Sequence, residues 1–217
     1  MGARAAVSGR VRADLVIVWR GGSVEGVLVQ QGSEVSVEIV GLLVSPVHAY
    51  EGRPDDGPLP DPDGRRPASV TVRAGNGLVG DRYFGREAHR QAAVTLFAAE
   101  SLTAVAHELA LPTVPDPLLT RRNVVLRGFP VDELAAGRDR SGAVFSLDSG
   151  DGPVRFRAHR PANPCRWMDV VLAQGAFRAM RGRGGVRCAP LDDGVLRLGP
   201  ALLRVHEPAA PTATRPS

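Results

Sequence analysis

The chain has 217 residues, and its 27 basic residues are all arginine, set against 23 acidic residues for a formal net charge of +4. The absence of lysine excludes a Walker-type phosphate loop and Schiff-base chemistry with pyridoxal phosphate, because both need a lysine amine. A charge of +4 gives no reason to expect nucleic-acid binding. No run reaches the roughly 18 apolar residues of a membrane span, so we expect a cytoplasmic protein without a membrane partner.

Composition divides the chain into three parts. Residues 1–34 are rich in Gly, Ala and Val with weak periodicity, and we expect either an N-terminal extension or a poorly ordered arm. Residues 35–206 form the structured domain, and residues 207–217 are expected to be a disordered Pro/Ala/Thr tail. The two cysteines, Cys165 and Cys188, are too few for a disulfide framework.

The periodicity of apolar residues predicts many short strands and few helices. Alternation predicts a half-buried strand at 35–39, and five prolines predict a long surface loop over 51–69. Helical spacing of Leu102, Val105, Ala106 and Leu109 predicts a helix at 98–110. Further strands are expected at 70–73, 92–97, 123–126, 144–147 and 154–158, a second helix at 167–180, and a closing hairpin of 195–198 with 202–205. These elements predict a mainly β (α+β) fold, a barrel with a few packed helices.

Residues Gly75 to Gly80 match the letters of a G-x-G-x-x-G dinucleotide fingerprint. That fingerprint must open a helix within a parallel β–α–β unit, whereas residues 81–85 show no helical period. We therefore interpret this segment as a glycine turn or a ligand-facing loop.

Cys165 lies just ahead of the second predicted helix, between Arg160 and Arg166. Guanidinium groups and a helix N-terminus favour the thiolate, the form of cysteine that binds metals or attacks electrophiles. On charge and position alone, an ordinary half-buried thiol is the stronger interpretation. Cys188 lies in an apolar, strand-like context and is expected in the core.

Arginines recur near a predicted strand and could form an anion site. Arg121, Arg122 and Asn123 enter the strand, and Arg82, Arg160, Arg183 and Arg187 could join them around a phosphate or another anion. For any single one of them, solvated surface arginine is the default. Gly184 lies in a glycine-rich stretch that either lets the backbone approach a ligand closely or makes a turn.

Five short motifs, taken in order, resemble the MOSC domain, which is named for the C-terminal part of molybdenum cofactor sulfurases. They are Val44 to His48, Gly77 to Arg82, Arg121 to Asn123, Pro164-Cys165, and Arg183 to Val186. The resemblance covers residues 38–205 and is to stand-alone, bacterial-type members. The usual Gly-Asp near the end of the domain is Gly199-Pro200 in this chain.

The resemblance implies a MOSC-type β-barrel that binds the molybdenum cofactor (molybdopterin). In relatives that act alone, the cysteine matching Cys165 binds molybdenum as a thiolate, and the enzymes reduce N-hydroxylated compounds. It therefore implies that Cys165 is the metal ligand and a catalytic residue, with Asp81 as a second catalytic candidate. The implied cofactor contacts are Arg82, Arg121, Arg122, Asn123, Arg183 and Gly184.

Three hypotheses remain open on the sequence. The first is an oxidoreductase that reduces a small N-oxygenated substrate with electrons from a separate redox protein. The second is a non-catalytic carrier of the cofactor or of sulfur for a biosynthetic or acceptor enzyme, and the third is a barrel for another anionic ligand. A complete sulfurase is excluded, because its pyridoxal-phosphate domain is absent and this chain has no lysine, so we expect no pyridoxal phosphate.

Overall fold

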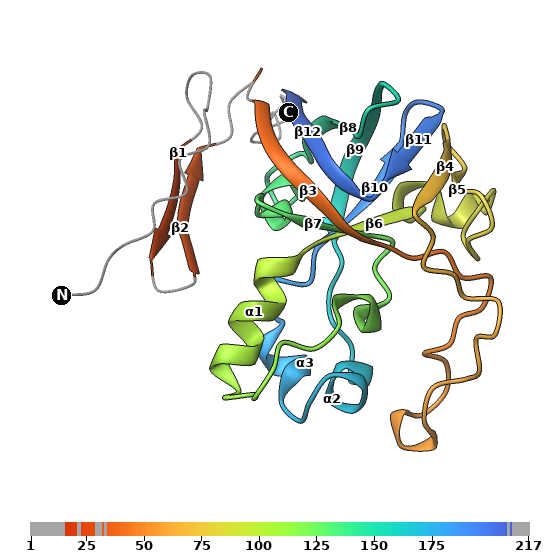
Figure 1. Cartoon of the computed structure of the whole chain (residues 1–217), viewed down its shortest axis with the longest axis vertical. Helices are drawn as coiled ribbons and strands as arrows, with labels where there is room; N and C mark the ends of the chain where they lie inside the picture. Colours follow the sequence, from red (N-terminus) through yellow and green to blue (C-terminus); the bar gives the residue numbers. More distant parts are fainter. Residues whose placement is uncertain (1–15, 21–22, 29–31, 33, 208, 210–217) are drawn as a thin grey trace, which may run out of the picture.

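The computed structural model describes residues 16–20, 23–28, 32, 34–207 and 209, and its main feature is a β-barrel with short helices at one end (Figure 1). The strands are β1 (Val16–Arg20), β2 (Ser23–Leu28), β3 (Glu34–Leu42), β4 (Ser69–Arg73), β5 (Gly77–Leu78), β6 (Val94–Ala98), β7 (Val124–Arg127), β8 (Val144–Asp148), β9 (Pro153–Pro161), β10 (Val186–Pro190), β11 (Gly194–Arg197) and β12 (Gly199–Glu207). The α-helices are α1 (Ala99–Glu108), α2 (Trp167–Val171) and α3 (Ala176–Ala179), and the 3-10 helices are η1 (Pro54–Asp56), η2 (Glu87–Ala92), η3 (Pro117–Thr120) and η4 (Val131–Leu134).

Seven strands close the barrel in the order β10-β6-β7-β3-β12-β8-β9, with β9 pairing back to β10. All neighbouring pairs are antiparallel except β6 and β7, which are parallel. A parallel pair needs a crossover connection, and α1 supplies it between β6 and β7. A separate three-stranded sheet, β11-β4-β5, lies beside the barrel. The predicted mainly β barrel with few helices is therefore confirmed.

The barrel core follows from alternation along strands such as β3 and β9, together with strands β7 and β8, which are buried at consecutive positions. In β3, Val35, Val37 and Ile39 are buried while the residues between them are exposed. Phe156 in β9 is fully buried and its ring stacks on that of Phe145, with centroids 5.6 Å apart. The two-residue periodicity that predicted these strands thus points one face of each into a common interior.

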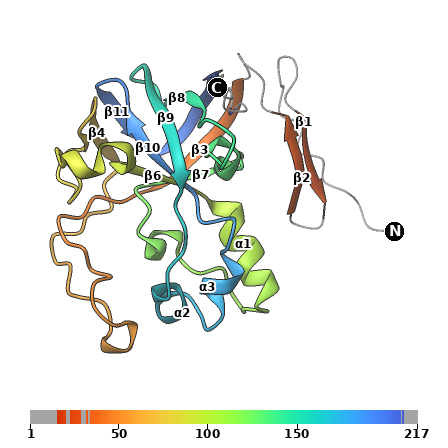
Figure 2. The ribbon, with the colours of Figure 1, turned by 180° about the vertical axis from the view of Figure 1, so that it is seen from behind.

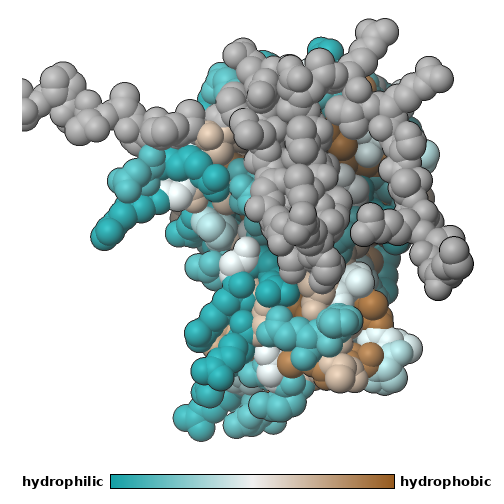
Figure 3. Space-filling view, turned by 90° about the vertical axis from the view of Figure 1, so that its left-hand side faces the viewer, coloured by the Kyte–Doolittle hydropathy of each residue, from teal (hydrophilic) through white to brown (hydrophobic). Residues whose placement is uncertain are grey.

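The helices cover one end of the barrel and enclose a second apolar cluster (Figures 1 and 2). Leu102, Val105 and Ala106 of α1 are buried, as their spacing predicts, and Leu109 packs at the edge of the cluster. Seen from the side on which α1 lies, hydrophilic side chains cover much of the lower surface and apolar residues gather toward one edge (Figure 3). None of the helices in the described ranges is long and apolar enough to cross a lipid bilayer.

The predicted closing hairpin is wrong. β11 pairs with β4, whereas β12 pairs with β3 and β8 inside the barrel. Gly199, with a φ of 111°, lies at the junction and lets the chain change sheets there. Strand spacing alone could not tell a hairpin from two neighbouring strands that belong to different sheets.

The predicted helix at 167–180 is two short helices, α2 and α3. Gly175 precedes α3 with a φ of 92°, outside the right-handed helical region, so one continuous helix cannot form. The glycine fingerprint at 75–80 opens no helix either: residues 74–76 form the turn between β4 and β5, residues 77 and 78 are β5 itself, and the two strands are antiparallel.

The predicted end segments lie largely outside the described residues. Within residues 1–34, β1 and β2 form an antiparallel pair, and in the described ranges 16–20 and 23–28 neither strand pairs with the barrel. β12 ends at Glu207, and of the tail predicted over 207–217 only Glu207 and Ala209 are described.

We expect Phe156→Ala to destabilise the barrel by about 3–5 kcal/mol, because it removes a fully buried ring from a closed interior. Urea denaturation followed by circular dichroism measures this. Leu202→Ala, at a strand position that is 40% exposed, should cost less than about 1 kcal/mol. Equal losses in the two variants would contradict this assignment of the core.

Candidate functional site

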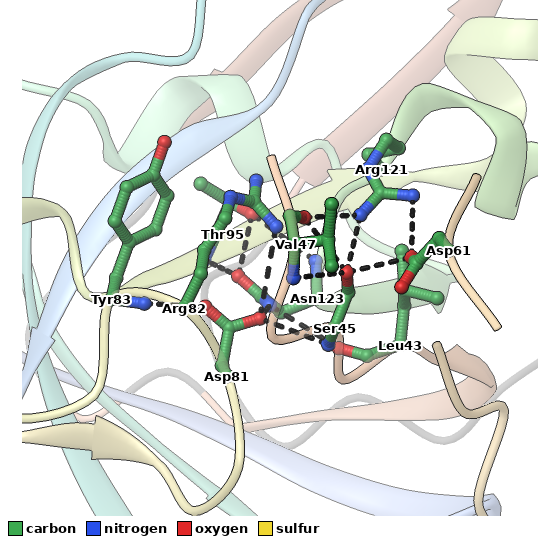
Figure 4. Close-up of polar contacts among 10 residues, drawn as sticks. All are labelled: Leu43, Ser45, Val47, Asp61, Asp81, Arg82, Tyr83, Thr95, Arg121 and Asn123. Carbon is green, nitrogen blue, oxygen red and sulfur yellow. Dashed lines mark hydrogen bonds and ion pairs between the residues drawn. The ribbon is translucent and has the colours of Figure 1, made fainter. Parts of the chain in front are cut away.

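The candidate site begins where β6 and β7 start. Because these strands are parallel, Thr95 at the start of β6 and Asn123 just before β7 come to the same barrel edge (Figure 4). The Asn123 Oδ1 accepts hydrogen bonds from the backbone N–H and the hydroxyl of Thr95, both at 2.9 Å. Its Nδ2 donates to the Leu43 carbonyl at 3.2 Å and to Asp81 Oδ2 at 3.0 Å. All four hydrogen bonds that the Asn123 side-chain amide can make are therefore formed within the protein, and they join β6, the residue after β3 and Asp81.

Asp81 is the buried carboxylate that accepts a hydrogen bond from Asn123. Its side chain is 1% exposed, and its carboxylate accepts from the backbone N–H groups of Ser45 (3.4 Å) and Tyr83 (3.1 Å) as well as from Asn123. The Arg82 Nη1 lies 3.9 Å from Asp81 Oδ2. Asp81 thus holds the turn that carries Arg82 and Tyr83 (Figure 4).

Arg121 ties the long 44–69 segment to the site. Its Nη1 donates to Asp61 Oδ2 at 2.9 Å, and its Nη2 donates to the Val47 carbonyl at 2.9 Å and to the Ser45 hydroxyl. The backbone of Arg121 is left-handed, with a φ of 58°, a strained conformation for a residue with a Cβ. The side-chain contacts hold it in place.

Arg122 joins two loops by hydrogen bonds to carbonyl groups. Its Nε donates to Gly184 O at 3.0 Å, its Nη1 to Thr120 O at 3.1 Å, and its Nη2 to Ala162 O at 2.8 Å. A Cβ on Gly184 would lie 2.3 Å from the Ala162 carbonyl oxygen, so only glycine allows this approach. Gly184 therefore serves loop packing.

A cavity of about 60 Å³ lies among these groups. It is lined by Arg82, Tyr83, His89, Ala92, Thr95, Arg121, Arg122, Ala162 and Arg187. Four of these residues are arginines, and no lining residue within the described part of the chain is acidic. A wider hollow of about 460 Å³ shares three of the residues, Arg82, Tyr83 and His89, and adds Pro46, His48, Arg86, Glu87 and Ala88.

Three guanidinium groups around the cavity keep a donor unused. The Nε atoms of Arg82, Arg121 and Arg187 are buried and have no hydrogen-bond partner among the described residues. Burial, and after it the neighbouring charge of Arg187, lower the pKa of Arg122 to about 10. Burial and the charge of Arg160 likewise lower the pKa of Arg187. An anion in the cavity would satisfy these donors and relieve their mutual repulsion.

Cys165 is an exposed free thiol in the loop between β9 and α2 (Figure 2). The loop is the one that Arg122 holds at Ala162, and the Cys165 charge raises the pKa of Arg122 against the effect of burial. Next to it, Trp167 stacks on Tyr50, with ring centroids 5.3 Å apart. Cys188 is fully buried in the barrel, and burial raises the pKa of its thiol beyond its usual range, so this cysteine is a core residue, as expected.

The structure brings most of the sequence-predicted residues together. Arg82, Arg121 and Arg122 line the cavity, and Asp81 and Asn123 hydrogen-bond to each other and to the lining residues Tyr83 and Thr95. Arg183 does not line the cavity, and its Nη2 lies 3.4 Å from Glu108 Oε2.

Other residues of the site gave no signal in the sequence. Asp61 lies in the proline-rich loop and meets Arg121 only through the fold. Tyr83 and His89 pack against each other, with ring centroids 4.5 Å apart, in a segment without periodicity. Only their closeness in the chain to Asp81 and Arg82 could have drawn attention to them.

We expect Asp61→Asn to destabilise the protein by about 2 kcal/mol at neutral pH, because it removes the charge bound by Arg121. Burial opposes ionisation of Asp61, but hydrogen bonds from Ser45 and Arg121 outweigh it and lower its pKa. A lowered folded-state pKa gives stability that is fully present above about pH 5 and is lost as the pH falls through the folded value. The stability difference from wild type should therefore shrink in acid.

Urea denaturation at pH 7, 4 and 3 measures this difference. Glu38→Gln is the matched control, because it removes an acid from the exposed pair with Arg127 and should cost less than about 1 kcal/mol. A difference that does not change with pH would contradict the role given to the Asp61 charge.

The comparisons with known proteins agree with this fold. The crystal structure of the YuaD protein from Bacillus subtilis superposes with a TM-score of 0.61 at 15% identity, covering 81% of this chain and 98% of that one. YiiM from Geobacillus stearothermophilus (TM-score 0.49, 17% identity, 78% and 74% covered) and YiiM from Escherichia coli (0.48, 15%, 85% and 71%) are also similar. No curated protein matches the chain by sequence.

A family model described as the MOSC domain matches residues 80–203, more than half of the chain. The matched range contains Asp81, Arg82, the 121–123 motif and Cys165, which are the residues that build the site. The chain therefore belongs to the MOSC domain family.

Proposed function

We propose that the protein binds the molybdenum cofactor at the arginine-lined cavity and Cys165 and reduces N-hydroxylated compounds. The observation that carries the proposal is the set of three buried Nε donors, on Arg82, Arg121 and Arg187, that lack partners among the described residues around one cavity. Membership of the MOSC domain family supports the choice of cofactor.

The residues present fit an anionic pterin cofactor. Its phosphate is a strong acceptor, and guanidinium groups bind phosphate through charge-assisted hydrogen bonds. Arg82, Arg121 and Arg187 would hold the phosphate, and Asp81 and Asn123 keep the supporting backbone in place. Because every cation here is arginine, the cavity stays positive at neutral pH, including at Arg122 with its pKa of about 10.

Cys165 would supply the protein's thiolate to the metal. Soft thiolate ligands suit a thiophilic metal, and Cys165 is exposed and unpaired. The described residues contain no group of three or more His, Cys, Asp or Glu placed to hold a metal ion. Other ligands to a metal at Cys165 would therefore come from the cofactor and from solvent.

The bound cofactor supplies the two-electron chemistry: an R₂N–OH substrate takes up two electrons and two protons and becomes R₂NH and water. The electrons come from a separate redox protein. The residues of this chain would hold the cofactor, and the Cys165 thiol in the 162–165 loop stays exposed on the surface.

The wider hollow favours a catalyst over a carrier. It has a volume of about 460 Å³ and meets the anion cavity at Arg82, Tyr83 and His89, so a small substrate would lie beside the cofactor. Burial and the charge of Arg82 lower the pKa of His48 in this hollow, which keeps its imidazole neutral at physiological pH. A carrier needs no such space. The exposed free thiol also points to a reducing compartment such as the cytoplasm.

We expect Cys165→Ser to lose most of its bound molybdenum when the protein is purified from a molybdate-replete host, because serine offers no thiolate. Metal and pterin analysis of the purified protein measures this. Cys188→Ala is the control, since it removes the buried thiol and should keep the metal.

Two results would reject the proposal. One is wild-type protein free of molybdenum and pterin, and the other is an unchanged metal content in Cys165→Ser. Metal binding without turnover of a hydroxylamine-type compound, with an artificial electron donor, would favour the carrier.

We expect Arg187→Gln to weaken pterin retention by about tenfold or more, because a charge-assisted contact to the phosphate is lost. Pterin content after dialysis measures this. Arg157→Gln, which removes an exposed arginine paired with Glu207, should retain wild-type content. Equal losses in the two variants would show that general charge, and not the cavity, holds the pterin.

A further inference from the structure

The segment from Arg160 to Arg187 carries the positive charge of the chain. It contains six arginines and one acidic residue, Asp169, for a net charge of +5, while the whole chain has +4. Asp169 Oδ1 accepts the backbone N–H of Phe177 at 2.8 Å, so this carboxylate is already engaged. The rest of the chain is nearly neutral, and Cys165 lies within the basic segment.

Two loops of this segment lie against each other beside Cys165. The backbone N–H of Ala162 donates to Gly185 O at 2.8 Å. A Cβ on Gly184 would lie 3.2 Å from Pro164 Cδ, one residue before Cys165. The loop after α3 and the loop that carries the thiol therefore form one continuous surface.

Four arginines of the segment are exposed and make no ion pair within the described residues: Arg160, Arg166, Arg178 and Arg181. Arg178 lies within α3, and we name the other three, Arg160, Arg166 and Arg181, the arginine rim. The Arg181 guanidinium lies 5.2 Å from the centre of the Phe177 ring, so it rests on an apolar face and its charge is uncompensated. Outside the segment, some exposed arginines are paired, among them Arg127 with Glu38, Arg155 with Asp192, and Arg197 with Asp151. Others have no ion pair among the described residues: Arg53, Arg65, Arg86, Arg90 and Arg138. The rim differs from these in lying in the segment that carries Cys165.

We propose that the arginine rim is the docking surface for an acidic electron-donor protein. The proposal rests on the proposed function, because reduction of the substrate needs two electrons from outside the chain. Electron transfer falls steeply with distance, and the rim lies in the segment that carries the exposed thiol of Cys165, with Arg166 next to it in the chain. Electron-transfer encounters between proteins are small and steered by complementary charge, which unpaired arginines supply.

The placement of the rim favours a protein over a small anion. A small anion would be bound by the buried donors of the cavity, whereas the rim side chains are exposed and come from three places: the end of β9, the start of α2 and the loop after α3. The three rim side chains do not line either cavity described above. Their contribution would be the long-range electrostatic attraction of an acidic protein surface.

The experiment measures binding of oxidised acidic ferredoxin and of oxidised acidic flavodoxin to the full chain by calorimetry at 20 and 150 mM NaCl. We expect micromolar affinity for at least one of them at 20 mM salt. The triple variant Arg160→Gln/Arg166→Gln/Arg181→Gln should weaken it by about tenfold or more. The control Arg127→Gln/Arg155→Gln/Arg197→Gln removes the same charge from paired positions and should change it less than about threefold.

Each alternative outcome overturns the proposal. Absence of binding to either donor, or equal weakening in the two triple variants, excludes a specific surface. Binding of a 20-base-pair DNA duplex in place of the proteins would assign the rim to nucleic acid. Molybdenum content in the rim variant is a separate readout: a loss would place the rim in the cofactor site, whereas retained metal with lost docking separates this proposal from the proposed function.

Discussion

The guanidinium of Arg122 is the interaction on which the candidate site depends. It reaches carbonyl groups in the segment before β7, in the loop that carries Cys165, and in the glycine-rich loop before β10. The last two segments also meet through the hydrogen bond from Ala162 N–H to Gly185 O, and Arg122 joins both of them to the start of β7. One planar group with five donors can hold three backbone segments at once, which the single point charge of a lysine cannot do.

This arrangement has an electrostatic cost. Arg122 is buried beside Arg82 and Arg187, and the drop of its pKa to about 10 reflects both the loss of solvent and the neighbouring charges. Asp81 and Asp61 offset part of the repulsion, but both are already committed, to the 81–83 turn and to Arg121. The folded chain therefore keeps an excess of donors at one place. A site built this way has a lower free energy when an anion is bound.

Local patterns in the sequence predicted those strands and helices whose formation depends on residues close together in the chain. Alternation predicted β3 and β9, and helical spacing predicted α1. The lack of a helical period after residues 75–80 correctly excluded a dinucleotide-binding fingerprint there. The pairing of β11 with β4 could not be found this way, because a strand has the same alternation whichever partner it takes. The break at Gly175 was also missed, since one glycine inside an apolar pattern is compatible with a helix.

In the candidate site, too, the residue types could be predicted from the sequence, whereas the long-range contacts could not. The arginines near 121 and the cysteine at 165 were visible as residue types that suit an anion and a metal, and the family resemblance put them in one place. The contacts of Arg121 with Asp61, and the stacking of Tyr50 on Trp167, join residues 60 or more positions apart and leave no periodic trace. The role of Arg122 was also hidden, because the sequence cannot show whether a guanidinium faces a ligand or a carbonyl.

The parallel pairing of β6 and β7 has a consequence for how this protein can vary. Thr95 and Asn123 meet because the register sets Leu96 against Val124, and the intervening 99–120 segment only has to return the chain to the same barrel edge. The exposed turn at 110–114 can therefore lengthen without displacing either residue, whereas the apolar face of α1 is held by packing and Thr120 by its hydrogen bond from Arg122. Natural insertions and engineered fusions are best tolerated there, where the chemistry of the site is independent of the length of the connection.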